Sequence, residues 1–134
     1  MFSIDSRLLS SCFFLEEWPL SSVFLKNNSE YPWFILIPRQ PNLKSMDMLS
    51  SNLRYQLADE IHRLSIFVQD QFHPDQVNVG ALGNIVQQLH VHIIARFTHD
   101  KLWPEGVWQQ NLTDKPYTST ERAALIHAFH QGTR

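Results

Sequence analysis

A run of seven residues in the second half of the chain, Gln88-Leu89-His90-Val91-His92-Ile93-Ile94, constrains the fold most. Polar and apolar side chains alternate in it, which predicts a β-strand because successive side chains leave a strand on opposite faces. The apolar side chains can then enter a core. Gln88, His90 and His92 share the other face at a spacing of roughly 6.5–7 Å. Such a row of imidazoles can contact a phosphate, hold a metal ion or attack an electrophile.

The composition is that of a globular protein. The chain has 134 residues, of which 43% are hydrophobic and 18% are charged. This length predicts one domain, residues 1–134, that buries roughly two-thirds of its unfolded surface. A formal net charge of -2 gives no electrostatic argument for binding nucleic acid, which usually requires a basic face. A small phosphorylated ligand needs only a local site and stays possible.

The cysteine content and the N-terminal segment favour a cytoplasmic protein. Cys12 is the single cysteine, so neither an internal disulfide nor a cysteine-based zinc site can form, which fits a reducing compartment. Asp5 lies where a signal peptide would carry positive charge. No apolar run approaches the ~18 residues that a membrane span needs, so we expect no membrane association.

Two periodicities divide the rest of the chain. Strands are predicted at 22–26 and at 33–37, the second apolar on both faces and therefore buried. Between residues 47 and 72 the apolar residues fall on one helical face, with Asp47 or Ser50 as the N-cap. They are Leu53, Leu57, Ile61, Leu64 and Val68.

The segments around the histidine run read as turns and a terminal helix. Residues 78–84 contain two glycines and two asparagines, which predicts a turn with unusual backbone dihedrals or a close approach. In the loop 103–108, Trp103 and Trp108 could pack at a dimer surface or border a base pocket. Thr118-Ser119-Thr120-Glu121 has capping-box spacing before a short C-terminal helix. The fold class predicted is α+β with a mostly antiparallel sheet.

Three interpretations of His90 and His92 compete on the residues alone. They could be ordinary polar residues on the wet face of a strand. They could be two same-face metal ligands, with a third supplied by His99, Asp100 or Glu105. They could also do covalent phosphoryl chemistry, because a neutral imidazole is an effective nucleophile and neighbouring N–H donors stabilise charge on phosphate oxygens.

The stretch Gly83-Asn84-Ile85-Val86-Gln87-Gln88-Leu89-His90-Val91-His92-Ile93-Ile94 resembles the signature of the histidine-triad (HIT) family. That signature is His-φ-His-φ-His-φ-φ, with φ apolar, reached through a Gly-Gln turn. The resemblance extends to the strand 33–39, the helix 53–72 and the glycine turn, and so covers about residues 10–100. It implies the HIT-like α+β fold, a five-stranded antiparallel sheet with one long helix and a short C-terminal helix.

The resemblance also implies a site. HIT proteins hydrolyse or transfer nucleotidyl groups through the middle histidine of the triad, which by position is His90. His92, at the third position, would contact phosphate oxygens or assist the leaving group. Asn84 and the turn residue Gly83 would bind the phosphate. Asn27 would hold the ribose hydroxyls, with Asn28 nearly as good a candidate.

Two residues depart from the family pattern: Gln88 stands where the first His belongs, and Asn84 stands where a Gln belongs. Gln88 could donate an N–H group in catalysis but cannot carry charge or move a proton. Loss of about 1–3 kcal/mol of charge assistance would slow turnover about 5–150-fold. Replacing Gln88 with His should raise turnover if a missing imidazole limits it, and should not if the site is tuned around Gln.

The predicted function is therefore hydrolysis or transfer at the α-phosphate of a nucleoside phosphoramidate or a dinucleoside polyphosphate. The family resemblance implies a purine nucleotide or dinucleotide as substrate, a homodimer, no cofactor and no metal. A weakly active or non-catalytic nucleotide-binding protein is the first alternative, motivated by Gln88. A His-x-His metal-binding protein is the second.

Overall fold

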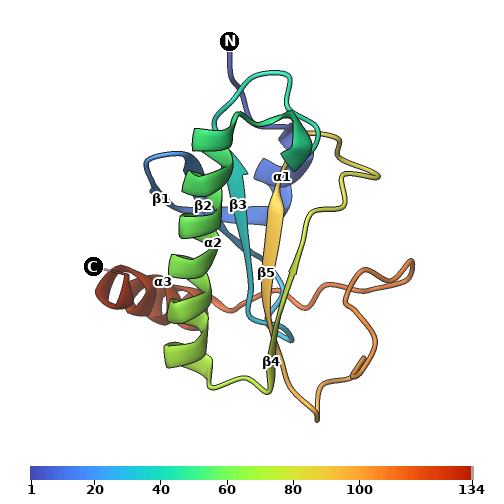
Figure 1. Cartoon of the computed structure of the whole chain (residues 1–134). Helices are drawn as coiled ribbons and strands as arrows, with labels where there is room; N and C mark the ends of the chain where they lie inside the picture. Colours follow the sequence, from blue (N-terminus) through green and yellow to red (C-terminus); the bar gives the residue numbers. More distant parts are fainter. Residues whose placement is uncertain (134) are drawn as a thin grey trace.

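A five-stranded antiparallel sheet lies at the centre of the computed structural model, which describes residues 1–133 (Figure 1). The strand order is β1-β2-β3-β5-β4. The strands are β1 (Cys12–Glu17), β2 (Ser21–Lys26), β3 (Trp33–Pro38), β4 (Gln76–Gly80) and β5 (Val91–Arg96). The helices are α1 (Ser6–Ser11), α2 (Ser51–Phe72) and α3 (Ser119–Gly132), and Met46–Met48 form a short 3-10 helix. The expected sheet, long helix and C-terminal helix are confirmed; α1 was not predicted.

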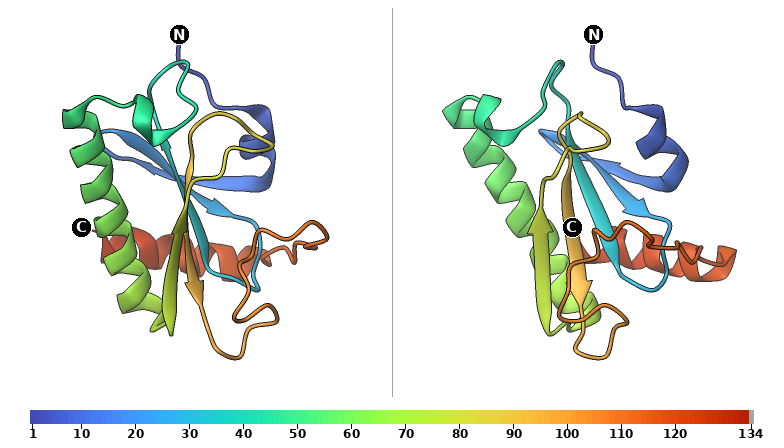
Figure 2. Two further views of the ribbon diagram at one scale, coloured as in Figure 1. Left: turned by 45° about the vertical axis from the view of Figure 1, so that its right-hand side comes forward. Right: turned by 90° about the vertical axis from the view of Figure 1, so that its right-hand side faces the viewer.

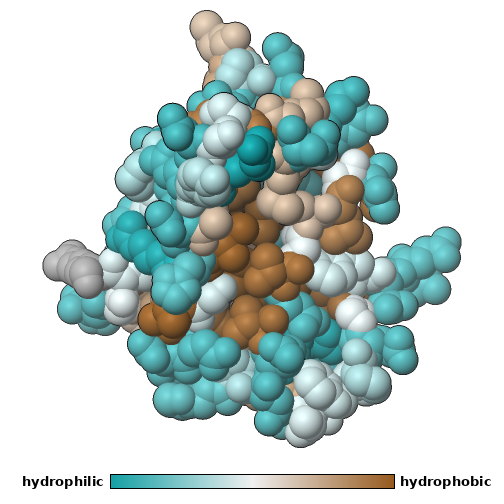
Figure 3. All heavy atoms as spheres, in the orientation of Figure 1, coloured by the Kyte–Doolittle hydropathy of each residue, from teal (hydrophilic) through white to brown (hydrophobic). Residues whose placement is uncertain are grey.

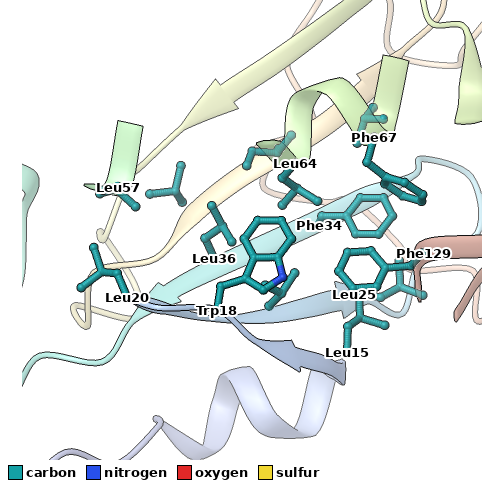
Figure 4. Packing of buried hydrophobic residues seen from close by; sticks show 14 of the residues in the cluster. Leu15, Trp18, Leu20, Leu25, Phe34, Leu36, Leu57, Leu64, Phe67 and Phe129 are labelled. Carbon is teal, nitrogen blue, oxygen red and sulfur yellow. The ribbon is translucent and has the colours of Figure 1, made fainter. Parts of the chain in front are cut away.

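The long helix α2 covers one face of the sheet, and α1 lies beyond the other face (Figure 2). Ser50, not Asp47, caps α2 by accepting a hydrogen bond from the Leu53 amide. The predicted apolar stripe of α2 packs against the sheet, as does Phe129 of α3. Figure 4 shows Phe34 of β3 among Phe67, Phe129 and Trp18, which together form the centre of this main core.

The capping box predicted at the start of α3 is confirmed. The Thr118 hydroxyl accepts from the Glu121 amide, and the Glu121 carboxylate accepts from the Thr118 amide. Two otherwise unpaired amides of the first turn are thereby satisfied. This fixes the place where the chain leaves its last loop and returns to the core.

The opposite face of the sheet carries a second apolar cluster. β3 is buried along its whole length, as predicted, because Phe34 and Leu36 enter the main core while the alternating residues enter this second cluster. The second cluster contains Leu8, Phe24, Tyr31, Trp33, Ile35, Ile37, Ile94 and Val107. It is covered by α1 and by the loop that follows β5. The alternation of β5 sends His92 to this second face.

The segment 78–84, predicted as a turn, is only partly one. Its first three residues belong to β4, which pairs with β5 in the antiparallel register Gly80 to His92. The turn was predicted to begin too early, because Val77, Asn78 and Val79 alternate apolar and polar side chains and continue the strand β4. The irregular backbone expected there is nevertheless present. Gly83 has a φ of 68°, and the Trp108 ring approaches Gly80 so closely that a Cβ atom would meet it at 2.9 Å.

The strand predicted to begin near Gln88 begins instead at Val91. Gln88, Leu89 and His90 precede it without pairing in the sheet, and the Leu89 amide donates to Leu43 O at 2.8 Å. The alternation still holds, since Leu89, Val91 and Ile93 all lie in the main core. Within residues 1–133 no helix is both long and apolar enough to cross a bilayer.

Candidate active site

His90 and His92 lie together on the wall of a cavity of about 470 Å³ on the second face of the sheet. Their ring centroids are 4.8 Å apart, and the two residues are 7% and 8% exposed. The cavity extends between α1, the loop 82–86 and the loop 107–114. Its lining combines apolar side chains with a few polar ones, the usual character of a small-molecule site.

The hydrogen bond of the His90 ring determines which of its nitrogens is free. Nδ1 lies 2.7 Å from Gln88 O, and a carbonyl oxygen can only accept, so Nδ1 carries a proton. In the neutral ring the lone pair is therefore on Nε2. His90 lines the cavity, and its neutral ring has a free lone pair on Nε2.

His92 has the opposite arrangement. The indole Nε1–H of Trp33 donates to His92 Nδ1 at 2.9 Å, and this indole can only donate. The proton of the neutral His92 ring is therefore on Nε2. Burial lowers the pKa of His92 to about 3, and the nearby His90 and Lys26 act in the same direction. At neutral pH His92 is an uncharged N–H donor.

Asn84 and Gly83, both assigned to phosphate binding from the sequence, line the same cavity as the two histidines. Gly83 has a positive φ, which permits the turn directly before Asn84. The Asn84 side chain is exposed there and can reach a ligand with both an amide donor and a carbonyl acceptor. The structure therefore brings four of the predicted site residues to one cavity.

Gln88 does not belong to this group. Its carboxamide makes two hydrogen bonds to the N-terminal segment, to Ser3 O at 2.7 Å and from the Asp5 amide at 2.9 Å. It is not part of the cavity lining. Both ends of the Gln88 amide are engaged with the N-terminal segment, so the assignment of Gln88 as a catalytic donor stays a prediction that this geometry does not favour.

The two asparagines assigned to the ribose also lie outside the cavity lining. Asn27 Oδ1 accepts from the Tyr117 amide at 2.9 Å. Asn28 is fully buried; its Oδ1 accepts from the Glu30 amide and its Nδ2 donates to Asp114 Oδ1. Both side chains fasten the loop before α3 to the end of β2. Their assignment to ribose binding stays a prediction, which these contacts do not favour.

Sequence reasoning missed a charged pair that does line the cavity. Lys26 Nζ lies 3.5 Å from Asp114 Oδ2, and Lys26 also lies over the Trp33 ring at 5.2 Å from its centroid. Asp114 comes from the loop before α3, 88 residues along the chain. No local sequence pattern could have predicted that Lys26 and Asp114 lie in contact. Arg7 of α1 and Trp108 complete the wall.

A second, more open hollow of about 790 Å³ adjoins this cavity but contains neither histidine. The two share Gln109, Gln110, Leu112 and Asp114 on their common wall. We place the site in the smaller cavity because it holds the imidazoles. Among residues 1–133, no group of three or more His, Cys, Asp or Glu side chains is clustered as metal ligands.

Comparisons with known proteins identify the family of this chain. The HIT domain family model matches residues 9–99. A histidine triad protein of Bradyrhizobium japonicum is 36% identical, with 99% of this chain and 98% of that chain covered and a TM-score of 0.95. One from Marinobacter aquaeolei is 34% identical, covering 99% and 96%, with a TM-score of 0.95.

A third histidine triad protein, from Sinorhizobium meliloti, is 30% identical, covers 98% of this chain and 96% of that chain, and has a TM-score of 0.94. No curated protein matches the chain. The family model spans more than half of the sequence, and the solved relatives superpose over nearly all of it. This chain therefore belongs to the HIT domain family.

Proposed function

We propose that this protein is a nucleotidyl hydrolase or transferase that attacks the α-phosphate of a nucleotide through His90. Proteins of the HIT family bind nucleotides and include nucleotidyl hydrolases and transferases. One observation carries the proposal: within one cavity, His90 offers a lone pair on Nε2 while His92 offers an N–H on Nε2. A nucleophile beside a donor is what attack on a phosphate requires.

The reaction has two steps. The Nε2 lone pair of His90 forms a bond to the α-phosphorus, and the bond from phosphorus to the leaving group breaks with its electron pair going to that group. Water, or another acceptor hydroxyl, then attacks the same phosphorus and releases its proton to the solvent, and the phosphorus–nitrogen bond breaks to return the lone pair to Nε2. The hydrogen bond from Nδ1 to Gln88 O holds the ring in one orientation through both steps.

His92 stabilises charge in this scheme. Negative charge spreads over the phosphate oxygens during the transfer, and a preorganised N–H in a dry wall is most effective there. Trp33 keeps that N–H on Nε2, because its indole already donates to Nδ1. Because His92 is neutral, it also adds no positive charge beside His90 in this buried place.

The leaving group follows from the same chemistry. A neutral His92 is a good hydrogen-bond donor but a poor acid, so it does not readily protonate an amine. A phosphate or nucleotide leaving group departs as a stable anion and needs no proton. We therefore favour dinucleoside polyphosphates and related anhydrides over phosphoramidates as substrates, with phosphoramidates as the slower class.

The rest of the cavity supports a nucleoside. Trp33, Trp108 and Leu112 give it apolar walls that suit a purine ring. Lys26 and Asp114 lie on the same lining, and the Asp114 carboxylate is an acceptor for ribose hydroxyls. We assign the ribose contact to this carboxylate in place of Asn27.

The test follows an isotope through a single turnover. Diadenosine tetraphosphate is mixed with excess enzyme in ¹⁸O-labelled water, and the products are analysed by mass spectrometry. We expect the label on the phosphate of AMP, because water attacks the α-phosphorus attached to His90. His90→Ala should abolish turnover while AMP still binds. Turnover that survives His90→Ala, or label found only on the other product, would refute the mechanism.

A protein that binds nucleotides without turnover is the second candidate, since the chain lacks the first histidine of the triad. It predicts that AMP binds to the wild type and that diadenosine tetraphosphate is not consumed. The same experiment therefore separates the two candidates.

We also propose a homodimer joined at β4. This strand is an edge of the described sheet, and its free backbone groups can pair with a second copy. Val79 on β4 is 47% exposed. Figure 3 shows apolar side chains gathered between α2 and β4 on the face turned to the viewer. HIT-fold proteins often form dimers.

A further inference from the structure

The carboxamide of Gln88 joins two parts of the chain that are more than 80 residues apart. Its Nε2–H donates to Ser3 O at 2.7 Å, over a separation of 85 residues. Its Oε1 accepts from the Asp5 amide at 2.9 Å, over 83 residues. Both partners are backbone groups, so they would be present whatever the side chains of residues 3 and 5. Gln88 thus fastens the N-terminal segment, residues 1–11, beside His90.

A second contact fastens the same segment to the loop before the histidines. The Arg7 Nη1–H donates to Ile85 O at 3.2 Å. Its Nε and Nη2 donate to the two carboxylate oxygens of Asp5, at 3.0 and 2.9 Å. These hydrogen bonds lower the pKa of Asp5 to about 2, so Asp5 is ionised and caps α1 by accepting from the Arg7 amide.

The segment held in this way is part of the cavity. Arg7, Leu8 and Ser11 all line the space that contains His90 and His92. Leu8 is buried in the second apolar cluster, against Trp33 and its neighbours. Arg7 uses three of its five N–H groups in the contacts above. The others can serve an anionic ligand.

We propose that Gln88 is a positioning residue that clamps the N-terminal segment as a wall of the nucleotide cavity, so that Arg7 and Leu8 meet the substrate and Gln88 does not. The nucleotide as occupant rests on the proposed function; the clamp does not. It also explains why an amide suits position 88. A carboxamide presents a donor and an acceptor side by side on one terminal carbon, and both are used. An imidazole carries its two nitrogens in other directions and could satisfy one partner at most.

The clamp predicts a different outcome for Gln88→His from the one expected if a missing imidazole limited turnover. The new ring would release Ser3 O or the Asp5 amide, and the wall would loosen. We expect the KM for a nucleotide substrate to rise about 5–30-fold, the scale of one or two hydrogen bonds. The kcat should stay within about 2-fold, because the wall contributes binding and not chemistry.

The first measurement is hydrogen exchange of the N-terminal peptide, residues 1–11, without any nucleotide. Gln88→Ala and Gln88→His should both exchange faster there than the wild type. Gln88→Glu should be intermediate, since it keeps the acceptor for the Asp5 amide and loses the donor to Ser3 O. Gln87→Ala is the matched control, because the neighbouring Gln87 is exposed; it should match the wild type. Peptides of α2 report whether each variant is folded.

The second measurement is calorimetric titration with AMP, together with kcat and KM for the dinucleotide. Weaker AMP binding in the Gln88 variants with unchanged kcat is the expected result. Exchange of residues 1–11 that is the same in Gln88→Ala and the wild type would overturn the clamp. So would a kcat lowered in Gln88→Ala at unchanged KM. Failure of AMP to bind the wild type would refute the nucleotide site, while the exchange result still decides the clamp.

Discussion

The two histidines of the candidate site differ in the state of Nε2 because their Nδ1 atoms have different partners. His90 Nδ1 faces a carbonyl that can only accept, and His92 Nδ1 faces an indole that can only donate. The neutral ring of His90 therefore presents a lone pair on Nε2, and the neutral ring of His92 presents an N–H on Nε2. Trp33 creates this division, and it does so from β3, 59 residues away from His92 along the chain.

The low pKa of His92 makes a prediction about stability. Unfolded, an imidazole gains a proton as the pH falls below about 6.5; folded, His92 stays neutral down to about pH 3. The unfolded state then binds more protons, so stability is full above pH 6.5 and is lost as the pH falls toward 3. Each pH unit in that range costs about 1.4 kcal/mol from this residue.

Urea unfolding at pH 7 and pH 5 measures this effect. His92→Asn removes the titrating group, so the loss of stability between the two pH values should be about 2 kcal/mol smaller than in the wild type. His62→Asn is the control, because His62 is exposed on α2, and it should behave like the wild type. An equal pH dependence in His92→Asn and the wild type would contradict the neutral, buried His92.

At the scale of single residues, the sequence was informative where a local pattern determines the outcome. The alternation placed His90 and His92 on one face, and the family resemblance assigned Asn84 to the same site, whose cavity all three residues line. The hydrogen bonds of Gln88 were not predicted because its partners, Ser3 and Asp5, are distant in sequence. No pattern around residue 88 contains that information.

The elements were predictable wherever one face is buried. α2 shows a helical stripe because it packs on the sheet, and β3 is apolar throughout because both faces are covered. β4 was missed in part, since an edge strand with half-exposed residues has a weak pattern. α1 has only six residues, too few for a periodicity to be seen.

The start of α3 gives a prediction at this scale. Thr118→Ala removes the hydroxyl that accepts from the Glu121 amide, and it should lower the free energy of unfolding by about 1 kcal/mol. Thr120→Ala is the control, because Thr120 is exposed and does not cap the helix. Urea denaturation measures both. The capping account fails if the two variants lose the same stability.

At the scale of the whole molecule, the sheet separates the main hydrophobic core from the candidate site. Its first face holds the main core (Figure 4), to which α2 and α3 contribute side chains. Its second face holds the cavity. The cavity is closed by segments from both ends of the chain, α1 and the loop 107–114. Their meeting was not predictable from sequence, because it depends on the tertiary fold alone.

The proposed dimer is tested on the same scale. Val79→Lys places a charge on the exposed edge strand β4, which should prevent strand pairing between two copies. Sedimentation at micromolar concentration should show a dimer for the wild type and a monomer for the variant. Phe14→Lys is the matched control, since Phe14 is an exposed apolar residue on β1, the opposite edge. It should stay dimeric. A monomeric wild type would refute the dimer.

The central claim is that His90 bonds directly to the α-phosphorus, and trapping that bond tests it most directly. Enzyme is mixed with a dinucleoside polyphosphate labelled at its α-phosphates, quenched in alkaline denaturant within milliseconds, digested and mapped by mass spectrometry. We predict a nucleotidyl group on the peptide that contains His90, labile to acid and absent in His90→Ala. Complete turnover with no labelled peptide at any quench time, or a label on a residue other than His90, would contradict the account.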